Sequence, residues 1–363
     1  MEKANTSKSD VVIIGSGPAG LTAATYLSRG GFKPLLVTGS QVGGQLLLTN
    51  HVENFPGFDL ISGFELTDKM KKQAEKFGTE TVTDLVVEIK KLDQETKKVD
   101  GCKKHLAGKE GKFGFLVKTA AGKEYQARAV LVAVGASAQW LAAPGIGHFK
   151  NKGISACAVC DGPFFKDKVV AVIGGGDTAF TEIEFLSRFV KKIYLIHRRE
   201  NFRAEKILQD RALVKKKVAP IYNSTVLEFL GDQKLAGLKL ASSFKVESGK
   251  YAGQIKNYPQ KYGNGKFDQN QTGLEWTLPV EGAFIAIGFK PNTEFLKARL
   301  PARQGFIDLD EKGYIVVKDG VFTSVPGVFA AGDCADFKYR QAITAAGAGC
   351  KAAIEIEEYL KKS

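Results

Sequence analysis

A length of 363 residues allows about two domains with full-sized cores. A composition of 44 % hydrophobic and 25 % charged residues excludes a disordered chain. No apolar run approaches the roughly 20 residues that cross a bilayer. The polar start, Met1 to Lys8, has no signal-peptide pattern, so we expect a cytoplasmic protein with no membrane association.

The formal net charge of +13 suggests nucleic acid as one possible partner. The lysines, however, are scattered in pairs and triplets such as 215–217, without interleaved aromatic residues or a nucleic-acid-binding motif. We therefore expect a solvated basic surface and no nucleic-acid partner. A positive field would still favour phosphate-bearing cofactors and an acidic protein partner.

The five cysteines are too few for a structural disulfide framework. Cys102, Cys334 and Cys350 stand alone and are interpreted as unpaired thiols. Cys157 and Cys160 form a Cys-x-x-Cys pair, which in a reducing compartment is catalytic or metal-binding. A structural zinc site usually needs four Cys or His ligands. Because the chain has no second such pair and only four His, we expect no metal.

The chain opens with a nucleotide-binding pattern. A buried strand over 10–14 runs into Gly15-Ser16-Gly17-Pro18-Ala19-Gly20, followed by a helical pattern over 18–29 and a strand over 34–38. In this strand–turn–helix–strand context the glycines permit a tight turn and close approach of the backbone to a pyrophosphate. The second strand ends in Val37-Thr38-Gly39, without the acidic residue that often holds a ribose.

A helix is expected over 63–77, and the polar stretch 97–112 reads as a hairpin excursion. A buried strand over 129–134 then ends in the glycine turn at Gly135. The stretch 245–272 is rich in Lys, Gly, Asn and Gln, and fits a long loop within a β-meander.

The nucleotide pattern occurs a second time. A strand over 168–173 precedes Gly174-Gly175-Gly176-Asp177-Thr178-Ala179, and a helix over 180–189 and a strand over 192–196 follow. The next residues, His197-Arg198-Arg199-Glu200-Asn201-Phe202-Arg203, are basic where an NAD site would carry an acid. Arginine there suits a 2′-phosphate, so the pattern favours NADPH over NADH.

Two apolar strands that end in glycine, over 129–134 and 282–287, bracket the second unit. We therefore expect an α/β protein with two Rossmann-like, three-layer ββα dinucleotide-binding domains, one inserted into the other. Residues 1–137 and 282–363 would form the first domain. Residues 138–281, which include Cys157 and Cys160, would form the inserted NADPH-binding domain.

The two nucleotide motifs and the dithiol together suggest an electron relay. Nicotinamide does not normally reduce a disulfide directly, whereas a flavin can accept a hydride and pass on both electrons, so FAD is expected at the first motif. Asp333, after an apolar strand, could hold a hydroxyl of the FAD chain, and Arg340-Gln341-Ala342 opens the last helix. Asp161, directly after the cysteines, is a candidate proton donor to the departing thiolate, or else a surface carboxylate.

Almost the whole chain resembles the low-molecular-weight thioredoxin reductases. Besides the motifs above, the match rests on Gly43-Gly44-Gln45, Val52-Glu53-Asn54-Phe55-Pro56-Gly57, Ser155-Ala156-Cys157-Ala158-Val159-Cys160-Asp161-Gly162, Ala331-Gly332-Asp333-Cys334 and Tyr339-Arg340-Gln341-Ala342. The resemblance implies a homodimeric flavoprotein that passes electrons from NADPH through FAD to oxidised thioredoxin. It also implies that Cys160 lies against the flavin, that Cys157 attacks the thioredoxin disulfide and that Asp161 is the acid.

The resemblance further implies two sets of cofactor-binding residues. The FAD set is Gly15, Gly17, Pro18, Ala19, Gly20, Thr38, Gly43, Gly44, Gln45, Asn54, Gly135, Gly332, Asp333, Arg340, Gln341 and Ala342. The NADPH set is Gly174, Gly176, Asp177, Thr178, His197, Arg198, Arg199 and Arg203. Because the dithiol and the NADPH set share one domain, the resemblance implies a rotation about crossings near Ser137 and Glu281.

The chain departs from the family pattern at Thr181, where a glutamate is common, and in the long stretches 97–112 and 245–272. Two other functions stay open at this point. One is a related FAD and NADPH enzyme that reduces another dithiol protein, such as a peroxiredoxin-type partner. The other is an FAD-binding regulatory protein without catalysis. The retained dithiol and both nucleotide motifs argue against this second alternative.

Overall fold

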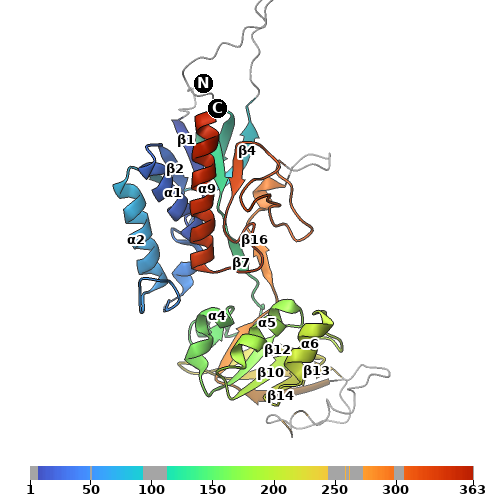
Figure 1. The fold of residues 1–363 in the computed structure, drawn as a ribbon. Helices are drawn as coiled ribbons and strands as arrows, with labels where there is room; N and C mark the ends of the chain where they lie inside the picture. The colour runs from blue at the N-terminus through green and yellow to red at the C-terminus, as the bar shows by residue number, and fades with distance from the viewer. Residues whose placement is uncertain are drawn as a thin grey trace, which may run out of the picture. The chain divides into compact units, whose positions relative to one another are not determined.

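The computed structural model describes residues 7–49, 51–92, 113–243, 258, 261, 273–297 and 306–362. The chain divides into two compact units (Figure 1): unit 1 is Met1–Ser137 with Lys290–Ser363, and unit 2 is Ala138–Phe289. The second crossing thus lies eight residues beyond the expected 281/282 boundary. The reason is β15 (Gly282–Ile285), which pairs in parallel with β9 (Val169–Ile173) and β8 (Ile154–Ser155) and so belongs to the sheet of unit 2.

Unit 1 is built on a seven-stranded sheet in the order β3-β2-β1-β6-β5-β4, with β17 paired to β6. Its strands are β1 (Ser7–Ile14), β2 (Pro34–Val37), β3 (Glu80–Val82), β4 (Val86–Lys91), β5 (Phe115–Thr119), β6 (Glu124–Val132) and β17 (Val328–Ala330). Strands β3, β2, β1, β6 and β17 are parallel, and β4 and β5 add an antiparallel edge. The helices are α1 (Pro18–Arg29), α2 (Gly63–Lys76) and α9 (Ala342–Lys362), with short 3-10 turns η1 (Gly44–Leu48) and η3 (Glu294–Leu296).

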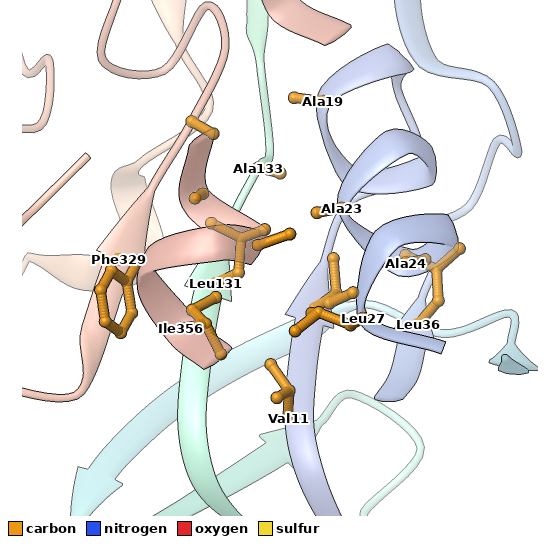
Figure 2. Close-up of a cluster of buried hydrophobic side chains, with 14 of the residues drawn as sticks. Val11, Ala19, Ala23, Ala24, Leu27, Leu36, Leu131, Ala133, Phe329 and Ile356 are labelled. Atoms are coloured by element: carbon orange, nitrogen blue, oxygen red, sulfur yellow. The ribbon is translucent and has the colours of Figure 1, made fainter. Parts of the chain in front are cut away.

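Both faces of the second half of β1 are buried, which explains why its last four residues, 11–14, are all apolar. Val11 and Ile13 face the cluster under α1 and α9, while Val12 and Ile14 face the cluster on the other side of the sheet. Figure 2 shows the first cluster, in which Leu27 of α1 and Ile356 of α9 meet the strand residues. Burial of each such large side chain stabilises the unit by about 1.5–3 kcal/mol.

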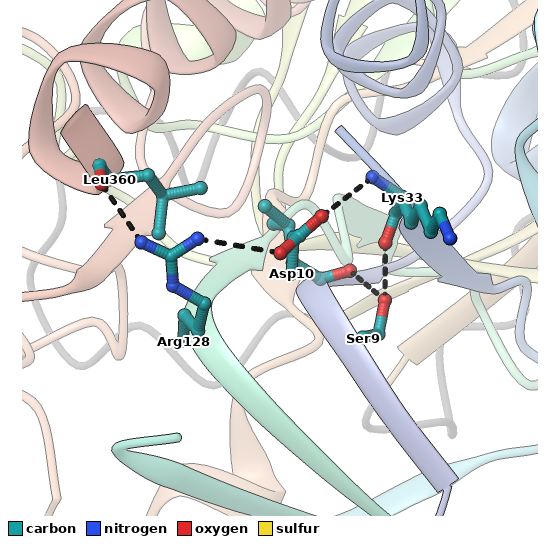
Figure 3. Close-up of polar contacts among 6 residues, drawn as sticks. Ser9, Asp10, Lys33, Arg128 and Leu360 are labelled. Atoms are coloured by element: carbon teal, nitrogen blue, oxygen red, sulfur yellow. Dashed lines mark hydrogen bonds and ion pairs between the residues drawn. The ribbon is translucent and has the colours of Figure 1, made fainter. Parts of the chain in front are cut away.

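A polar group at the start of β1 ties three further segments together (Figure 3). The Arg128 guanidinium on β6 contacts the Asp10 carboxylate at 3.4 Å and donates to the Leu360 carbonyl at 2.9 Å. The same carboxylate accepts the backbone N–H of Lys33 at 3.0 Å, just before β2. These bonds fix the end of α9 against β1, β2 and β6.

Unit 2 has a five-stranded parallel sheet in the order β11-β10-β9-β15-β8 and a three-stranded antiparallel sheet in the order β12-β13-β14. The further strands are β10 (Lys192–Ile196), β11 (Val218–Ile221), β12 (Ser224–Gly231), β13 (Leu235–Ser243) and β14 (Gly273–Pro279). The helical segments are α3 (Ile146–Phe149), α4 (Ala158–Asp161), η2 (Gly162–Phe165), α5 (Asp177–Leu186) and α6 (Lys206–Leu213). The short strands β7 (Ala136–Ala138) and β16 (Phe289–Pro291), at the two crossings, pair with each other.

Most expected elements are present within two residues of their expected bounds. The helix α1 spans the expected 18–29, whereas α5 begins at Asp177 instead of 180, because the end of the glycine motif already forms its first turn. The expected β-meander is β12-β13-β14. The stretch 97–112 and nearly all of 245–272 lie outside the described residues. Within the described ranges, no helix is both long and apolar enough to cross a membrane.

Candidate active site

The first glycine turn lies at the carboxyl end of β1, where open α/β sheets bind their ligands. Gly15 has φ +107°, and a side chain there would collide with the Ala133 carbonyl after β6. A side chain on Gly20 would collide with the Gly15 carbonyl, so α1 can approach β1 only with glycine at this position. Gly17 instead faces open space and caps α1 without a side-chain hydrogen bond, which leaves backbone donors for a phosphate.

A buried serine joins this turn to the segment after β2. The Ser16 hydroxyl donates to the Thr38 carbonyl at 2.8 Å and accepts the Gly43 N–H at 3.1 Å. This places Gly43, Gly44 and Gln45 at the start of η1, with Gly44 beside Gly17. Thr38 itself is buried and its hydroxyl donates to the Gly39 carbonyl. Ser16 was not among the predicted site residues, although it lies inside the glycine motif.

Other predicted FAD residues gather in the same unit. Gly332 has φ +78° and contacts Ala19 on α1, which brings the segment after β17 to the first turn. Asn54 donates to the Gln341 side-chain carbonyl at 3.4 Å, although the two are 287 residues apart in sequence. Ala342 begins α9, two residues after Arg340, which has an uncommon φ of +47°.

Asp333 is a largely buried carboxyl group whose pKa is raised. Burial, reinforced by the nearby Asp336 carboxylate and opposed by Arg340, raises the pKa of Asp333 to about 6. Among the described residues no hydrogen bond reaches its side chain. A hydroxyl donor would therefore stabilise the carboxylate, as expected for a residue that holds the FAD chain. Gly135 follows β6 in a left-handed conformation, and its carbonyl accepts the Asn292 N–H at 3.1 Å.

The second glycine turn repeats the first at the carboxyl end of β9. Gly174 has φ +159°, and a side chain there would collide with the Ala286 carbonyl after β15. Gly176 faces open space and caps α5 without a side-chain hydrogen bond. The turn therefore has the same exposed backbone donors for a phosphate. Thr178 lies half-buried in the first turn of α5.

The loop after β10 folds back onto this turn. The Arg203 N–H donates to the Gly175 carbonyl at 2.7 Å, and the Glu205 N–H donates to the Asp177 carboxylate at 2.8 Å. Asp177 thus supports the loop, and its predicted contact with the nucleotide stays a prediction. These bonds bring Arg203 to the glycine turn from 28 residues along the chain.

The basic segment separates into a buried histidine and exposed arginines. His197 is 6 % exposed, packs against Gly175 and contacts the Asn201 carbonyl through Nε2 at 3.0 Å. Burial, with the positive charges of Arg199, Arg203 and Arg198, lowers the pKa of His197. The three guanidinium groups are exposed and make no ion pair with the residues that the structure describes. They are available to an anion, whereas His197 is positioned to support the loop.

The dithiol lies at the same edge of the unit 2 sheet. Cys157 and Cys160 follow β8 and form a disulfide with their Cα atoms 5.3 Å apart. Cys157 caps the four-residue helix α4, and its sulfur accepts the Cys160 N–H at 3.2 Å. Because β8 and β9 both pair in parallel with β15, the disulfide and the second glycine turn follow carboxyl ends in one sheet.

Asp161 is hydrogen-bonded to Ser155, a residue of the motif that was not predicted to have a role. The buried Ser155 hydroxyl donates to the Asp161 carboxylate at 2.5 Å and accepts the Cys157 N–H at 3.0 Å. A second such residue is Glu182 on α5, whose carboxylate accepts the Ala158 N–H at 2.8 Å. Ser155 was inside the quoted motif and Glu182 is the neighbour of Thr181, so proximity in sequence was the available signal.

The structure describes two of the three remaining cysteines and allows a search for metal ligands among the described residues. Cys334 and Cys350 are free thiols, as predicted, and Cys102 lies outside the described residues. Burial raises the pKa of the Cys334 thiol to about 12, so this thiol is unreactive. In the part of the chain that the structure describes, no group of three or more His, Cys, Asp or Glu side chains could hold a metal ion.

Comparison with known proteins agrees with this geometry. The family model for pyridine nucleotide-disulphide oxidoreductases matches residues 9–349. A thioredoxin reductase of Streptomyces coelicolor is 43 % identical over 97 % of this chain and 94 % of its own. A bifunctional thioredoxin reductase/thioredoxin of Mycobacterium leprae is 41 % identical over 97 % of this chain and 66 % of its own.

Among solved structures, the thioredoxin reductase of Streptococcus pyogenes superposes with a TM-score of 0.78 at 34 % identity, covering 99 % of this chain and 100 % of that one. Enzymes of this kind depend on FAD and NADPH. The chain belongs to the pyridine nucleotide-disulphide oxidoreductase family, in its thioredoxin reductase branch.

Proposed function

We propose that this protein is an NADPH-dependent thioredoxin-disulfide reductase. The observation that carries the proposal is the Cys157–Cys160 disulfide, placed in the same unit and at the same sheet edge as a glycine turn flanked by exposed arginines. Thioredoxin as the protein substrate is supported by the names of the relatives, one of which joins a reductase and a thioredoxin in one chain.

The residues of both turns fit the two cofactors. The exposed N–H groups of α1, the open space at Gly17 and the desolvated Asp333 carboxylate would hold FAD in unit 1. Gly176 and the guanidinium groups of Arg198, Arg199 and Arg203 would hold NADPH in unit 2. When bound, the flavin supplies the passage of two electrons from a hydride donor to a disulfide.

The dithiol and its neighbours then perform a thiol–disulfide exchange. The Cys157 thiolate attacks the partner's disulfide, forming a mixed disulfide and releasing one partner thiolate. The Cys160 thiolate attacks the Cys157 sulfur, which restores the 157–160 disulfide and releases the second partner thiolate. The protein dithiol is oxidised by two electrons and the partner is reduced by two. Asp161 would supply a proton to a departing thiolate, with the Ser155 hydroxyl holding its carboxylate in place.

We also propose that unit 2 moves as a body, so that its dithiol and its nicotinamide site reach the flavin in turn. The proposal is supported by the presence of both on unit 2 and by the two crossings, at Ser137/Ala138 and Phe289/Lys290. A crosslink between the units should stop steady-state turnover while it leaves one half-reaction intact. Full turnover in the crosslinked protein would refute it.

A homodimer in the cytoplasm is the remaining part of the proposal. The family resemblance supports the dimer, and light scattering of the purified protein tests it. A dithiol that cycles, without a disulfide framework, supports a reducing compartment. Localisation of a tagged chain tests that compartment.

The decisive experiment follows NADPH oxidation by the purified flavoprotein with thioredoxin and a terminal disulfide dye, beside Cys157→Ser. We expect thioredoxin-dependent turnover in the parent protein and a fall to below about 1 % of that rate in the variant. NADPH should still reduce, and so bleach, the flavin of the variant. Bleaching without thioredoxin turnover in the parent would favour the alternative, reduction of another dithiol protein such as a peroxiredoxin-type partner.

A further inference from the structure

The buried N–H of Ala158 has an unexpected partner. Ala158, the residue after Cys157, is fully buried, so water cannot satisfy its backbone donor. The carboxylate that accepts it belongs to Glu182, 24 residues later and on a different helix. This bond ties α4, which carries the dithiol, to α5, which begins at the second glycine turn.

We propose that Glu182 is a positioning residue for the dithiol, which fixes α4 on α5 and, through its negative charge, opposes ionisation of the Cys157 thiol. The carboxylate accepts the N–H of Ala158, the residue that follows Cys157. This N–H belongs to the peptide unit that joins the two residues, so the negative charge lies close to the cysteine. A nearby negative charge disfavours a thiolate. A less acidic thiol forms a thiolate of greater intrinsic nucleophilicity. The effect of Glu182 on Cys157 can be measured whatever the protein substrate is. Only its consequence for turnover rests on the proposed function.

The charges around α4 make Glu182 the group to test. The elements packed against α4 are α5 and η2, and the sequence of η2, Gly162–Phe165, carries no charged side chain. On α4 itself the charged residue is Asp161, which is held by Ser155. On α5, Asp177 is bonded to the loop after β10 and Glu184 pairs with Lys215 at 3.2 Å.

The test measures alkylation of Cys157 by iodoacetamide against pH in the full-length holoprotein, in a Cys160→Ser background, by peptide mass. Glu182→Gln keeps an acceptor for the Ala158 N–H but removes the charge. We expect the alkylation profile to move to lower pH, with a rate about threefold to tenfold higher at pH 7. Glu184→Gln on the same helix is the matched control and should leave the profile in place. An unchanged profile in Glu182→Gln would overturn the electrostatic role.

A second variant separates charge from geometry. Glu182→Asp keeps the charge with a shorter reach, so its profile should stay near that of the parent. Equal shifts in the Asp and Gln variants would overturn the charge effect, because both would then report only a displaced α4. Neither measurement uses thioredoxin, so failure of thioredoxin turnover in the parent protein would refute the proposed function and leave this inference to its own result.

Discussion

The two glycine turns of this chain are built alike up to their third small residue. In each, the first glycine lies against a carbonyl that follows a neighbouring parallel strand, Ala133 in unit 1 and Ala286 in unit 2. In each, its N–H donates to the last residue of the next strand, at 2.8 Å for Gly15 and 3.0 Å for Gly174. The third position is Gly20 in unit 1 and Ala179 in unit 2.

The turns differ again after the second strand. In unit 1 the segment is uncharged, and Ser16 holds it by hydrogen bonds to Thr38 and Gly43. In unit 2 the segment is basic, and its own backbone bonds to Gly175 and Asp177 fold it onto the turn. We therefore expect the same backbone turn to bind a pyrophosphate in both units, and the segment after the second strand to select the nucleotide.

The largest effect on stability is expected at the third small residue of the turn, where unit 1 has glycine and unit 2 has alanine. Gly20→Ala would force Cβ into the Gly15 carbonyl, so we expect a loss of about 4 kcal/mol or more in the free energy of unfolding and loss of bound flavin. The converse change, Ala179→Gly, should cost only about 1 kcal/mol. Denaturant unfolding and flavin absorbance check both. A well-folded, flavin-loaded Gly20→Ala protein would contradict the comparison.

Asp333 in unit 1 should make stability depend on pH. Its folded pKa of about 6 lies above the ordinary value of 3.8, so the folded state binds a proton that the unfolded state lacks, and stability falls as pH rises from 4 to 6. Asp333→Asn should therefore stabilise the flavin-free protein by about 3 kcal/mol at pH 7, with the gain shrinking below pH 5, while FAD binds more weakly. Urea unfolding at pH 7 and below pH 5 measures the difference in the free energy of unfolding between parent and variant. A difference that does not change with pH would argue against the raised pKa of Asp333 as its cause.

The basic segment of unit 2 should govern the choice between NADPH and NADH. Removing one guanidinium, as in Arg199→Ala, should raise KM for NADPH about tenfold to a hundredfold and leave kcat/KM for NADH little changed. Steady-state kinetics with both cofactors measure it. Arg211→Ala, an exposed arginine on α6, is the control. A parallel loss with both cofactors would assign Arg199 a structural role.

The smallest effect is expected at His197. Its folded pKa is lowered, so the unfolded state binds more protons once pH falls below about 6.5, and stability is lost in that direction. The sign is opposite to that of Asp333. His197→Gln keeps a donor for the Asn201 carbonyl and should flatten the decline between pH 7 and 5. Thermal unfolding across this range tests it, and an unaltered decline in the variant would exclude His197 as its origin.

The amino-acid sequence alone was enough to predict the two glycine turns, their flanking strands and helices, and the redox pair. These features are local, because a left-handed glycine or a buried strand imposes its requirement within a few residues. The NADPH assignment followed from the basic segment after the second strand of the inserted unit, and the FAD assignment followed from the chemistry of electron transfer to a disulfide. The exact start of α5 did not follow, because a glycine turn and a first helical turn overlap in sequence.

Only the tertiary structure decided which sheet β15 joins and which side chains support the dithiol. An apolar strand that ends in glycine fits either sheet, and only its hydrogen bonds to β8 and β9 assign it to unit 2. The Glu182–Ala158 bond likewise depends on how two helices pack, and no pattern along the chain encodes it. Local backbone requirements can be seen in the sequence, whereas pairing between distant segments is settled by packing.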